Sequence, residues 1–327
     1  MPKTNPKGEI LLTVIDLATK KYIPMTDDTR LICALGNFDG VHIGHRKLLQ
    51  RVLDEKKKYG DDGNVKTAVW TFSEHPSIYL GNGEKSKCIT ELEEKLAIFG
   101  EMGIDIAVLE DFTEVRDMTP KEFADALYEK YHVREAICGF NYRFGAKGKG
   151  TPVHLAEYME KYGVKVICIE PVVCDEKIVS STLIRLYIEN GETEKAAKLL
   201  GRPFSINFPV VKGNQFGRKI GIPTINQRFS KYHIHPARGI YACTCNIEGD
   251  IFLGVANVGF RPTVNDDTCD INCETHIMNY HGWLYGKRIK VSFYKKLRDE
   301  RKFSNIEELK KAIKNDIKNT ENYFSDK

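Results

Sequence analysis

The sequence predicts an α/β domain followed by a β domain: a doubly wound parallel sheet, then an antiparallel β-barrel with a terminal helix. Three observations lead to this prediction. Between residues 31 and 171, apolar runs alternate with amphipathic helical segments, as in a parallel sheet covered by helices. After about residue 190, strand patterns come closer together and glycine-containing turns separate them, as in antiparallel barrels. Residues 305–322 have one apolar helical face.

The first domain is predicted to alternate strands and helices. Strands are expected at 31–35, 65–72, 104–109, 136–139 and 164–169. Helices are expected from near His45, and at 91–102, 119–131 and 155–162. The third helix has the clearest start, because Thr119 suits the N-cap, Pro120 suits the first turn and Glu122 stands at capping-box spacing.

The second domain is predicted to consist of strands at 208–212, 240–247, 251–258, 272–280 and 287–294. Turns are expected at Gly249-Asp250 and His281-Gly282, and Ser304 is expected to cap the final helix. A chain of 327 residues is long enough for two hydrophobic cores. We therefore divide it into domains 1–190 and 191–327.

The composition excludes several classes of protein. A net charge of +4, from 49 basic and 45 acidic residues, is too balanced for nucleic-acid binding through phosphate contacts alone. No segment is predicted to be a signal peptide or to span a membrane, so we expect a cytoplasmic protein without a membrane partner. Among nine cysteines, Cys269 and Cys273 with His276 lack a well-spaced fourth ligand, and reduced thiols are expected.

The segment 36–45 is the most informative part of the first domain. It joins a predicted buried strand to a helix, where unpaired backbone N–H groups and the helix dipole attract anions. Its two histidines can donate to phosphate oxygens. The alternative is a structural or metal-binding histidine pair, which the surrounding strand, turn and helix make less favoured. The candidate phosphate-binding residues are Gly36, Asn37, Phe38, Gly40, His42 and His45.

Two more segments follow predicted strands and are candidates for ligand binding. In 139–145, Asn141 and Arg143 interleave with aromatic residues, a pattern that suits a planar ring; an aromatic hairpin packed on itself is an equal alternative. In 179–185, the hydroxyl residues Ser181 and Thr182 precede a helix, and Arg185 is expected in its first turn, where a guanidinium can bind phosphate.

The segment 213–226 is the densest signal in the second domain. Gly213, Gly217 and Gly221 give a phosphate-wrapping loop its backbone freedom, and Arg218 supplies charge. The alternative without a ligand is a glycine-rich β turn. The segment is not a Walker A loop, because Gly-Lys-Ser/Thr is absent.

Thr224 and Asn226 are neutral oxygen ligands at alternate positions of the same segment. On an extended strand they face one side, which suits Mg²⁺ shared with phosphates.

Along nearly its whole length, the chain resembles the prokaryotic bifunctional riboflavin kinase/FAD synthetases. The first half resembles their FMN adenylyltransferase module, a nucleotidyltransferase with a His-x-x-His turn, at 36–45, 139–145 and 179–185. The second half resembles their riboflavin kinase module at 217–218, 221–226, 239–241, 254–263, 274–276 and 296–303.

The resemblance implies that the first domain joins FMN to the α-phosphate of ATP, giving FAD and pyrophosphate. It implies that His42 and His45 contact the ATP phosphates as catalytic residues, and that Ser181, Thr182 and Arg185 hold the pyrophosphate side. On the flavin side it implies Asn141 and Arg143.

For the second domain, the resemblance implies transfer of the γ-phosphoryl group of ATP to the 5′-hydroxyl of riboflavin. Glu274 is then the general base, Thr224 and Asn226 hold Mg²⁺, and Arg298 with the final helix closes the flavin pocket. The implied substrates and products are riboflavin, FMN, FAD and ATP. The oligomeric state is not readable from the sequence.

The chain departs from the family pattern at a few positions. Asn141-Tyr142 stands where Asp-Phe is common, and Glu74 stands where proline is frequent. Ile225 replaces an alanine, and Trp283 replaces an acidic residue and is expected to affect the loop on the flavin side.

Two other functions were weighed against the bifunctional enzyme. A kinase whose first half has lost its activity is disfavoured, because both histidines and Ser181, Thr182 and Arg185 are present. A flavin-responsive RNA-binding regulator is disfavoured, because the chain has no basic stripe or RNA-binding signature.

Overall fold

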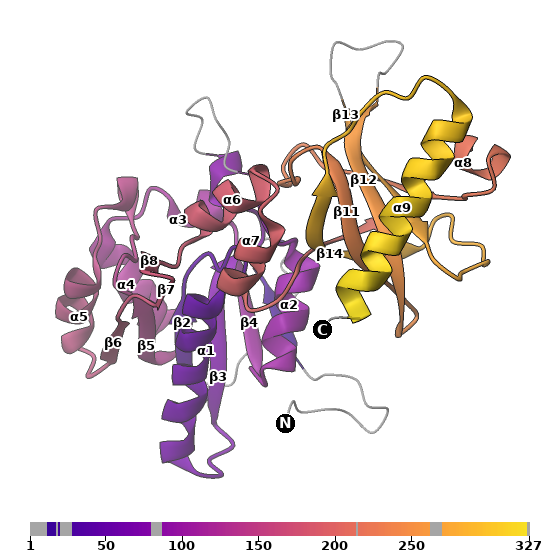
Figure 1. The fold of residues 1–327 in the computed structure, drawn as a ribbon. Coiled ribbons are helices and arrows are strands. Elements are labelled where there is room, and N and C mark those ends of the chain that lie inside the picture. Colours follow the sequence, from indigo (N-terminus) through magenta and orange to yellow (C-terminus); the bar gives the residue numbers. More distant parts are fainter. Residues whose placement is uncertain are drawn as a thin grey trace. The chain divides into compact units, whose positions relative to one another are not determined.

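The computed structural model describes residues 12–17, 19, 28–79, 87–213, 215–261 and 270–325. Cys269 and the end of the segment 254–263 lie outside these residues. The chain forms two compact units, 1–179 and 180–327 (Figure 1). Helices α6 (Ser181–Glu189) and α7 (Thr193–Leu200) therefore belong to the second unit, although the predicted division at residue 190 falls between them. That division stays a prediction.

The first unit contains a parallel sheet of six strands in the described residues, with the order β1-β4-β3-β2-β5-β6. This confirms the predicted doubly wound sheet. The strands are β1 (Thr13–Asp16), β2 (Arg30–Leu35), β3 (Val65–Phe72), β4 (Ile106–Glu110), β5 (Val133–Gly139) and β6 (Lys165–Ile169). The connecting helices are α1 (Ile43–Lys56), α2 (Leu92–Glu101), α3 (Phe112–Val115), α4 (Pro120–Glu129) and α5 (Pro152–Glu160). A small hairpin follows, β7 (Val173–Cys174) and β8 (Lys177–Ile178).

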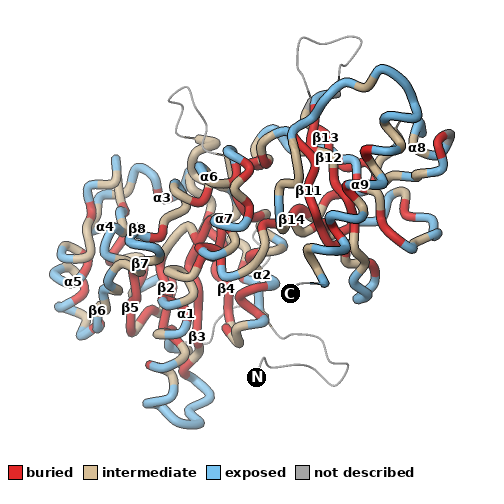
Figure 2. Tube along the Cα trace, in the orientation of Figure 1, coloured by how far each residue is buried: buried red, intermediate tan, exposed pale blue. Residues whose placement is uncertain are grey.

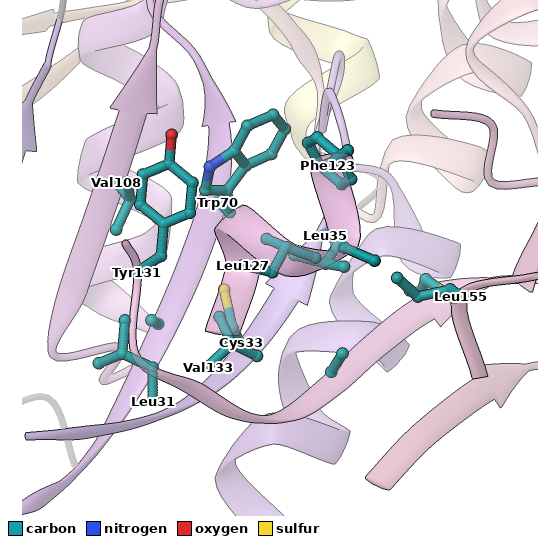
Figure 3. Close-up of a cluster of buried hydrophobic side chains, with 14 of the residues drawn as sticks. Leu31, Cys33, Leu35, Trp70, Val108, Phe123, Leu127, Tyr131, Val133 and Leu155 are labelled. Atoms are coloured by element: carbon teal, nitrogen blue, oxygen red, sulfur yellow. The ribbon is translucent and has the colours of Figure 1, made fainter. Parts of the chain in front are cut away.

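Each face of this sheet has its own core, because side chains alternate along a strand. Leu31, Cys33 and Leu35 of β2 pack with Trp70 and with residues of α4 and α5 (Figure 3). Ile32 and Ala34 of the same strand pack on the other face, with residues of α1 and α2. The strands β2, β3 and β4 are accordingly buried along most of their length (Figure 2). The capping box of Thr119 and Glu122 is formed as predicted.

The second unit contains an antiparallel sheet of six described strands in the order β10-β13-β12-β11-β14-β9. They are β9 (Phe204–Pro209), β10 (Ile225–Arg228), β11 (Gly239–Ile247), β12 (Asp250–Arg261), β13 (Asp270–Ile277) and β14 (Arg288–Arg298). A bridge between Val211 and Asn226 and a hydrogen bond from Gln227 Nε2 to the carbonyl of Phe208 link the outer strands, so the barrel is nearly closed. Gln227 Nε2 also donates to the carbonyl of Ile289 in β14. The short helix α8 (Phe216–Lys219) precedes β10, and α9 (Ile306–Ser325) packs on β11 and β12.

Several predicted boundaries in the second unit were wrong. β9 occupies 204–209 rather than 208–212, because Phe204, Ile206 and Phe208 point into the core and Pro209 ends the run. β13 ends at Ile277, before the positive φ of Asn279. Asn305, not Ser304, caps α9, since its side chain accepts a hydrogen bond from the N–H of Glu308 at 2.8 Å.

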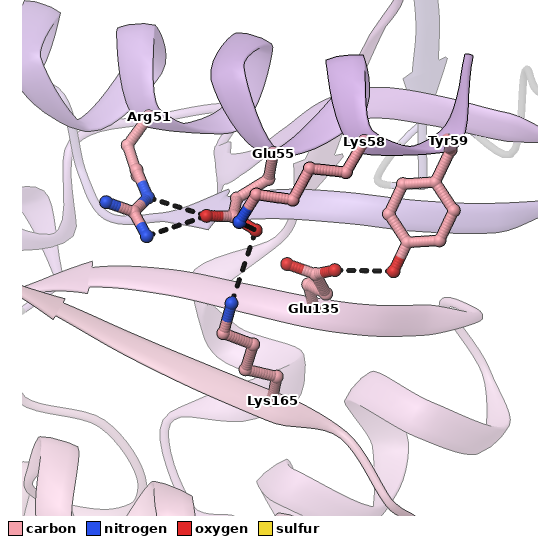
Figure 4. Close-up of polar contacts among 6 residues, drawn as sticks. All are labelled: Arg51, Glu55, Lys58, Tyr59, Glu135 and Lys165. Atoms are coloured by element: carbon pink, nitrogen blue, oxygen red, sulfur yellow. Dashed lines mark hydrogen bonds and ion pairs between the residues drawn. The ribbon is translucent and has the colours of Figure 1, made fainter. Parts of the chain in front are cut away.

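Glu55 is the centre of a polar network at the C-terminal end of α1 (Figure 4). Its carboxylate is 1% exposed and pairs with Arg51 at 2.7 Å, with Lys58, and with Lys165 of β6 at 3.3 Å. Burial alone would raise the pKa of this carboxyl, but the hydrogen bonds from Lys58 and Lys165 outweigh it and lower the pKa to about 2.

We expect Glu55→Gln to destabilise the first unit by about 1–3 kcal/mol at pH 7, because it leaves the surrounding cations without their partner. Because the pKa of Glu55 is lower in the folded than in the unfolded protein, its ionised carboxylate stabilises the folded state above pH 4.5. This stabilisation is lost as the pH falls toward 2. Urea unfolding followed by tryptophan emission measures the difference, because Trp70 is buried in this unit whereas Trp283 is already exposed. Asp54→Asn, which removes an exposed carboxylate of the same helix, should leave stability nearly unchanged. An equal loss in both variants would contradict the role of the network.

Candidate active sites

The predicted phosphate turn lies at the point where the strand order of the parallel sheet reverses. From β2 the chain continues to β3 and β4 on one side, and β5 pairs with β2 on the other. Leu35 is in register with Cys138, so the segments 36–45 and 139–145 leave the sheet at the same edge. In open α/β sheets, ligands bind in the crevice at this switch point.

His42 and His45 form one compact element at the start of α1. His42 is the N-cap, and its Nδ1 accepts a hydrogen bond from the N–H of His45 at 3.2 Å. The two rings stack with centroids 3.6 Å apart. Because Nδ1 of His42 is an acceptor, the neutral ring carries its proton on Nε2, which is then a donor.

The turn before α1 has an uncommon backbone. Phe38 and Val41 have positive φ angles of 53° and 37°, although neither is glycine, and both side chains are buried. Such conformations persist only where packing holds them. The ring of Phe38 packs on that of Phe99, with the two ring centroids 5.7 Å apart. Gly40 also has a positive φ, of 85°. At Gly36, a Cβ atom would approach the Phe38 ring to 3.2 Å.

Asn37 and Asp39 tie this turn to the rest of the unit. The carbonyl of Asn37 accepts hydrogen bonds from Thr71 Oγ1 at 3.2 Å and from Lys95 Nζ at 3.4 Å. The Asp39 carboxylate accepts from the N–H groups of Ile89 and Thr90. The position of Lys95 in the helix pattern, beside Leu96, Ile98 and Phe99, was a signal that we did not use.

The electrostatics of the turn favour neutral imidazole. Burial lowers the pKa of His45 well below its ordinary value, and repulsion from His42, when that ring is protonated, and from the Lys95 ammonium lowers it further. Nδ1 of His45 and Oδ1 of Asn37 are buried and have no hydrogen-bond partner in the described chain. Burial also lowers the pKa of Lys95, and the nearby Asp39 and Cys88 oppose this shift.

The segment 139–145 has aromatic side chains that pack on one another and three side chains that are exposed. Tyr142 and Phe144 stack at 5.7 Å, and Phe144 is buried against the core, as an aromatic hairpin would be. Phe140, Asn141 and Arg143 are exposed at the carboxyl end of β5. These three side chains are therefore accessible, and their contact with a planar ligand stays a prediction.

Ser181, Thr182 and Arg185 lie on α6, which belongs to the second unit. Ser180 caps this helix by accepting a hydrogen bond from the N–H of Leu183 at 3.2 Å. Because the helix then begins at Ser181, Arg185 falls in its second turn, and its expected place in the first turn was wrong. The pyrophosphate contacts of these residues stay predictions.

The barrel contains a cavity of about 280 Å³ between its strands and α9, here named the helix-side cavity. Phe303, Leu309 and Ile313 belong to its apolar lining on the side of α9. Arg298, predicted for the flavin pocket, lies in its wall and pairs with Asp316 of α9 at 2.8 Å. Asp316 is 2% exposed, so this ion pair is shielded from water and joins α9 to the end of β14.

Glu274 lines the same cavity, and in the sheet it is in register with Asn226 of β10 and Asn257 of β12. Thr224 and Asn226 both line this cavity, as the alternation along an extended segment predicts. Asn272 Nδ2 donates to Asn226 Oδ1 at 2.9 Å and to Glu274 Oε1 at 3.4 Å. Asn272 was not among the predicted site residues, although its place two residues before Glu274 on β13 puts it on the same face of the strand.

A second cavity of about 450 Å³, the loop-side cavity, shares Thr224 with the first. Its wall includes Arg218, Gly221 and the aromatic side chains of Trp283 and Tyr285. The ring of Trp283 packs against that of Tyr285, with centroids 4.8 Å apart, and Trp283 is 69% exposed. It therefore belongs to this second cavity rather than to the cavity under α9.

Glycines shape the loop beside both cavities. A Cβ atom at Gly213 would lie 2.4 Å from Asn226 Nδ2, and one at Gly217 would lie 2.3 Å from the carbonyl of Ile222. Gly221 has a positive φ of 81°. These three predicted loop glycines are thus required by close approach or by backbone conformation.

The two units define a class of protein with a nucleotide-binding α/β domain and a barrel that encloses a small-molecule site. Family models agree with this division: a model described as FAD synthetase matches residues 25–183, and one described as riboflavin kinase matches residues 200–324.

Curated relatives extend the match to nearly the whole chain. A protein of Listeria monocytogenes is 34% identical over 301 residues, covering 91% of this chain and 94% of that protein. One of Bacillus subtilis is 33% identical over 318 residues, covering 96% and 99%. Both are named bifunctional riboflavin kinase/FMN adenylyltransferase, as is one of Escherichia coli K12 at 33% identity. The chain belongs to the bifunctional riboflavin kinase/FMN adenylyltransferase family.

A solved structure shows the same fold. It is named a macrolide-efflux protein from Streptococcus pneumoniae, has 29% identity and a TM-score of 0.83, and covers 94% of this chain and 99% of its own. Within the part of the chain that the structure describes, we find no helix with the length and apolarity needed to cross a membrane.

Proposed function

We propose that this chain phosphorylates riboflavin to FMN in its barrel and adenylylates FMN to FAD in its α/β unit, using ATP in both reactions. The observation that carries the proposal is that each unit has its own candidate site. In the first unit it is the turn with His42 and His45 at the switch point, and in the second it is the cavity with Glu274. The proposed partners are small molecules, and the proposed location is the cytoplasm.

In the α/β unit, the N-terminal end of α1 would receive the phosphates of ATP. Nε2–H of His42 and the first backbone N–H groups of the helix would be the hydrogen-bond donors to these phosphates. FMN would lie toward Phe140, Asn141 and Arg143. An oxygen of its phosphate attacks the α-phosphorus of ATP, and the bond to pyrophosphate breaks. The protein aligns the two groups and stabilises the charge on their oxygens.

In the barrel, the two cavities suit the two substrates. The apolar wall of Phe303, Leu309 and Ile313 fits a flavin ring in the helix-side cavity. Arg218 and the aromatic rings of the loop-side cavity fit an adenine nucleotide. Glu274 would accept the proton of the 5′-hydroxyl as the γ-phosphoryl group of ATP is transferred to that oxygen.

Thr224 and Asn226 fit a magnesium ion shared with phosphates. They are neutral oxygen ligands on one side of the cavity, and Mg²⁺ uses few protein ligands together with phosphate and water oxygens. The ion, when bound, neutralises charge on the transferring phosphates. We expect Asn226→Ala to raise the Mg²⁺ concentration for half-maximal FMN formation about tenfold. FAD formation from added FMN is the control, and an equal change in both reactions would argue against this site.

The test of the proposed function is a coupled assay. The purified chain is incubated with riboflavin, ATP and Mg²⁺, and the flavins are separated by chromatography. We expect riboflavin to be converted to FMN and then to FAD, with pyrophosphate released. FMN without FAD would leave only the kinase, and unchanged riboflavin would contradict the proposal.

A further inference from the structure

Lys95 is a buried cation that neither proposed reaction uses. It lies in the first turn of α2, on the face that carries Ile98 and Phe99 into the core, and it is 5% exposed. Within the described residues its ammonium group donates one hydrogen bond, to the carbonyl of Asn37 at 3.4 Å. Taking an ammonium group out of water is costly, and one long hydrogen bond together with the attraction of the buried Asp39 carboxylate does not compensate for it, since the pKa of Lys95 stays below its ordinary value. The stability of the fold therefore does not explain a lysine at this position, and a role in the function of the unit does.

The contact with Asn37 fixes the direction of the neighbouring amide. The carbonyl of Asn37 points back to Lys95 Nζ and to Thr71 Oγ1. In a trans peptide the N–H group points opposite to the carbonyl, so the N–H of Phe38 points away from these two donors. This amide donates no hydrogen bond within the described part of the chain. It belongs to the turn whose backbone groups are the candidates for phosphate binding.

We propose that Lys95 is a positioning residue for adenylyl transfer, holding the Asn37–Phe38 peptide so that its N–H group faces the ATP phosphates and placing a buried positive charge behind it. A cation on the carbonyl also polarises the peptide and makes its N–H a stronger donor. This inference rests on the proposed function of the same unit.

The same ammonium group influences His45. The groups that face this imidazole are His42 on its own helix and Lys95 on α2, while Asp39 and Cys88 face Lys95. His75 lies 3.8 Å from the Asp39 carboxylate. Removing the charge of Lys95 raises the pKa of His45, so the ring becomes protonated at a higher pH. Activity that requires the neutral ring is then lost at a higher pH.

The experiment compares Lys95→Met with Lys95→Arg. We expect Lys95→Met to lower kcat/KM for FAD formation about 100-fold, because the preorganised donors are lost, while FMN formation by the same protein is unchanged. The acid limb of the pH profile of FAD formation should move to higher pH. Lys95→Arg, which keeps the charge, should recover at least about one tenth of the wild-type value. The matched control Lys161→Met removes an exposed cation of the same unit and should change nothing.

Urea unfolding followed by Trp70 emission shows whether Lys95→Met is folded. Retention of FAD formation within about threefold of wild type, or a loss without a shift of the acid limb, would overturn the inference. Should Lys95→Met not fold, Thr71→Val decides, since it removes the other donor to the Asn37 carbonyl. We expect a fall of at least about fivefold, and no fall would overturn the inference. A wild-type protein that makes no FAD refutes the proposed function instead.

Discussion

Replacing His42 by asparagine is expected to lower FAD formation from FMN about 100- to 1,000-fold and to leave FMN formation from riboflavin unchanged. The imidazole presents Nε2–H at the start of α1, and an asparagine cannot place a donor at the same distance from the backbone. Asparagine is, however, a good N-cap, so it can replace Nδ1 as the acceptor of the His45 N–H. Initial rates of the two reactions, measured separately by chromatography, give the result.

His42→Ala separates the two roles of this side chain. It loses both the cap and the imidazole, and it should be less stable than His42→Asn by about 1 kcal/mol, with the same loss of FAD formation. Full activity in His42→Asn would show that only the cap matters. Loss of both reactions in a folded variant would contradict the independence of the two sites.

Replacing Glu274 by glutamine is expected to give the opposite pattern. FMN formation should fall about 100-fold or more, because glutamine cannot accept the proton of the 5′-hydroxyl, while FAD formation from added FMN continues. Glutamine keeps the size of the side chain and an oxygen that can accept from Asn272 Nδ2.

The matched control for Glu274 is Glu248→Gln, at an exposed carboxylate of the barrel that pairs with Lys287. It should leave both reactions unchanged. A kinase rate in Glu274→Gln above about one tenth of wild type would contradict the general-base role, and would indicate that the metal and the alignment of substrates supply most of the rate.

The sequence predicted the fold best where a hydrophobic pattern is long. β3 occupies residues 65–72 as expected, and the capping box at Thr119 is formed. Short or polar elements were missed: β10, with the sequence Ile-Asn-Gln-Arg, has only one apolar residue, and its pairing with β13 comes from the barrel. α7 was missed as well, although Gly201 ends it in the left-handed conformation that is common after helices.

The candidate sites were predictable where residues able to bind or react with a ligand lie in or beside a predicted turn. His42, Glu274, Thr224 and Asn226 lie where a ligand can reach them, as the turn and strand patterns indicated. The supporting residues depend on distant parts of the chain. Lys95 meets Asn37 across 58 positions, a contact that no local pattern can predict.

Mixing two inactive variants tests the independence of the two sites most directly. With riboflavin and ATP, His42→Asn should stop at FMN, and Glu274→Gln should leave riboflavin nearly unchanged. An equimolar mixture should produce FAD, since FMN released by the first protein is adenylylated by the second. A mixture of the two folded proteins that accumulates FMN and makes no FAD would contradict the account of two separate sites in one chain.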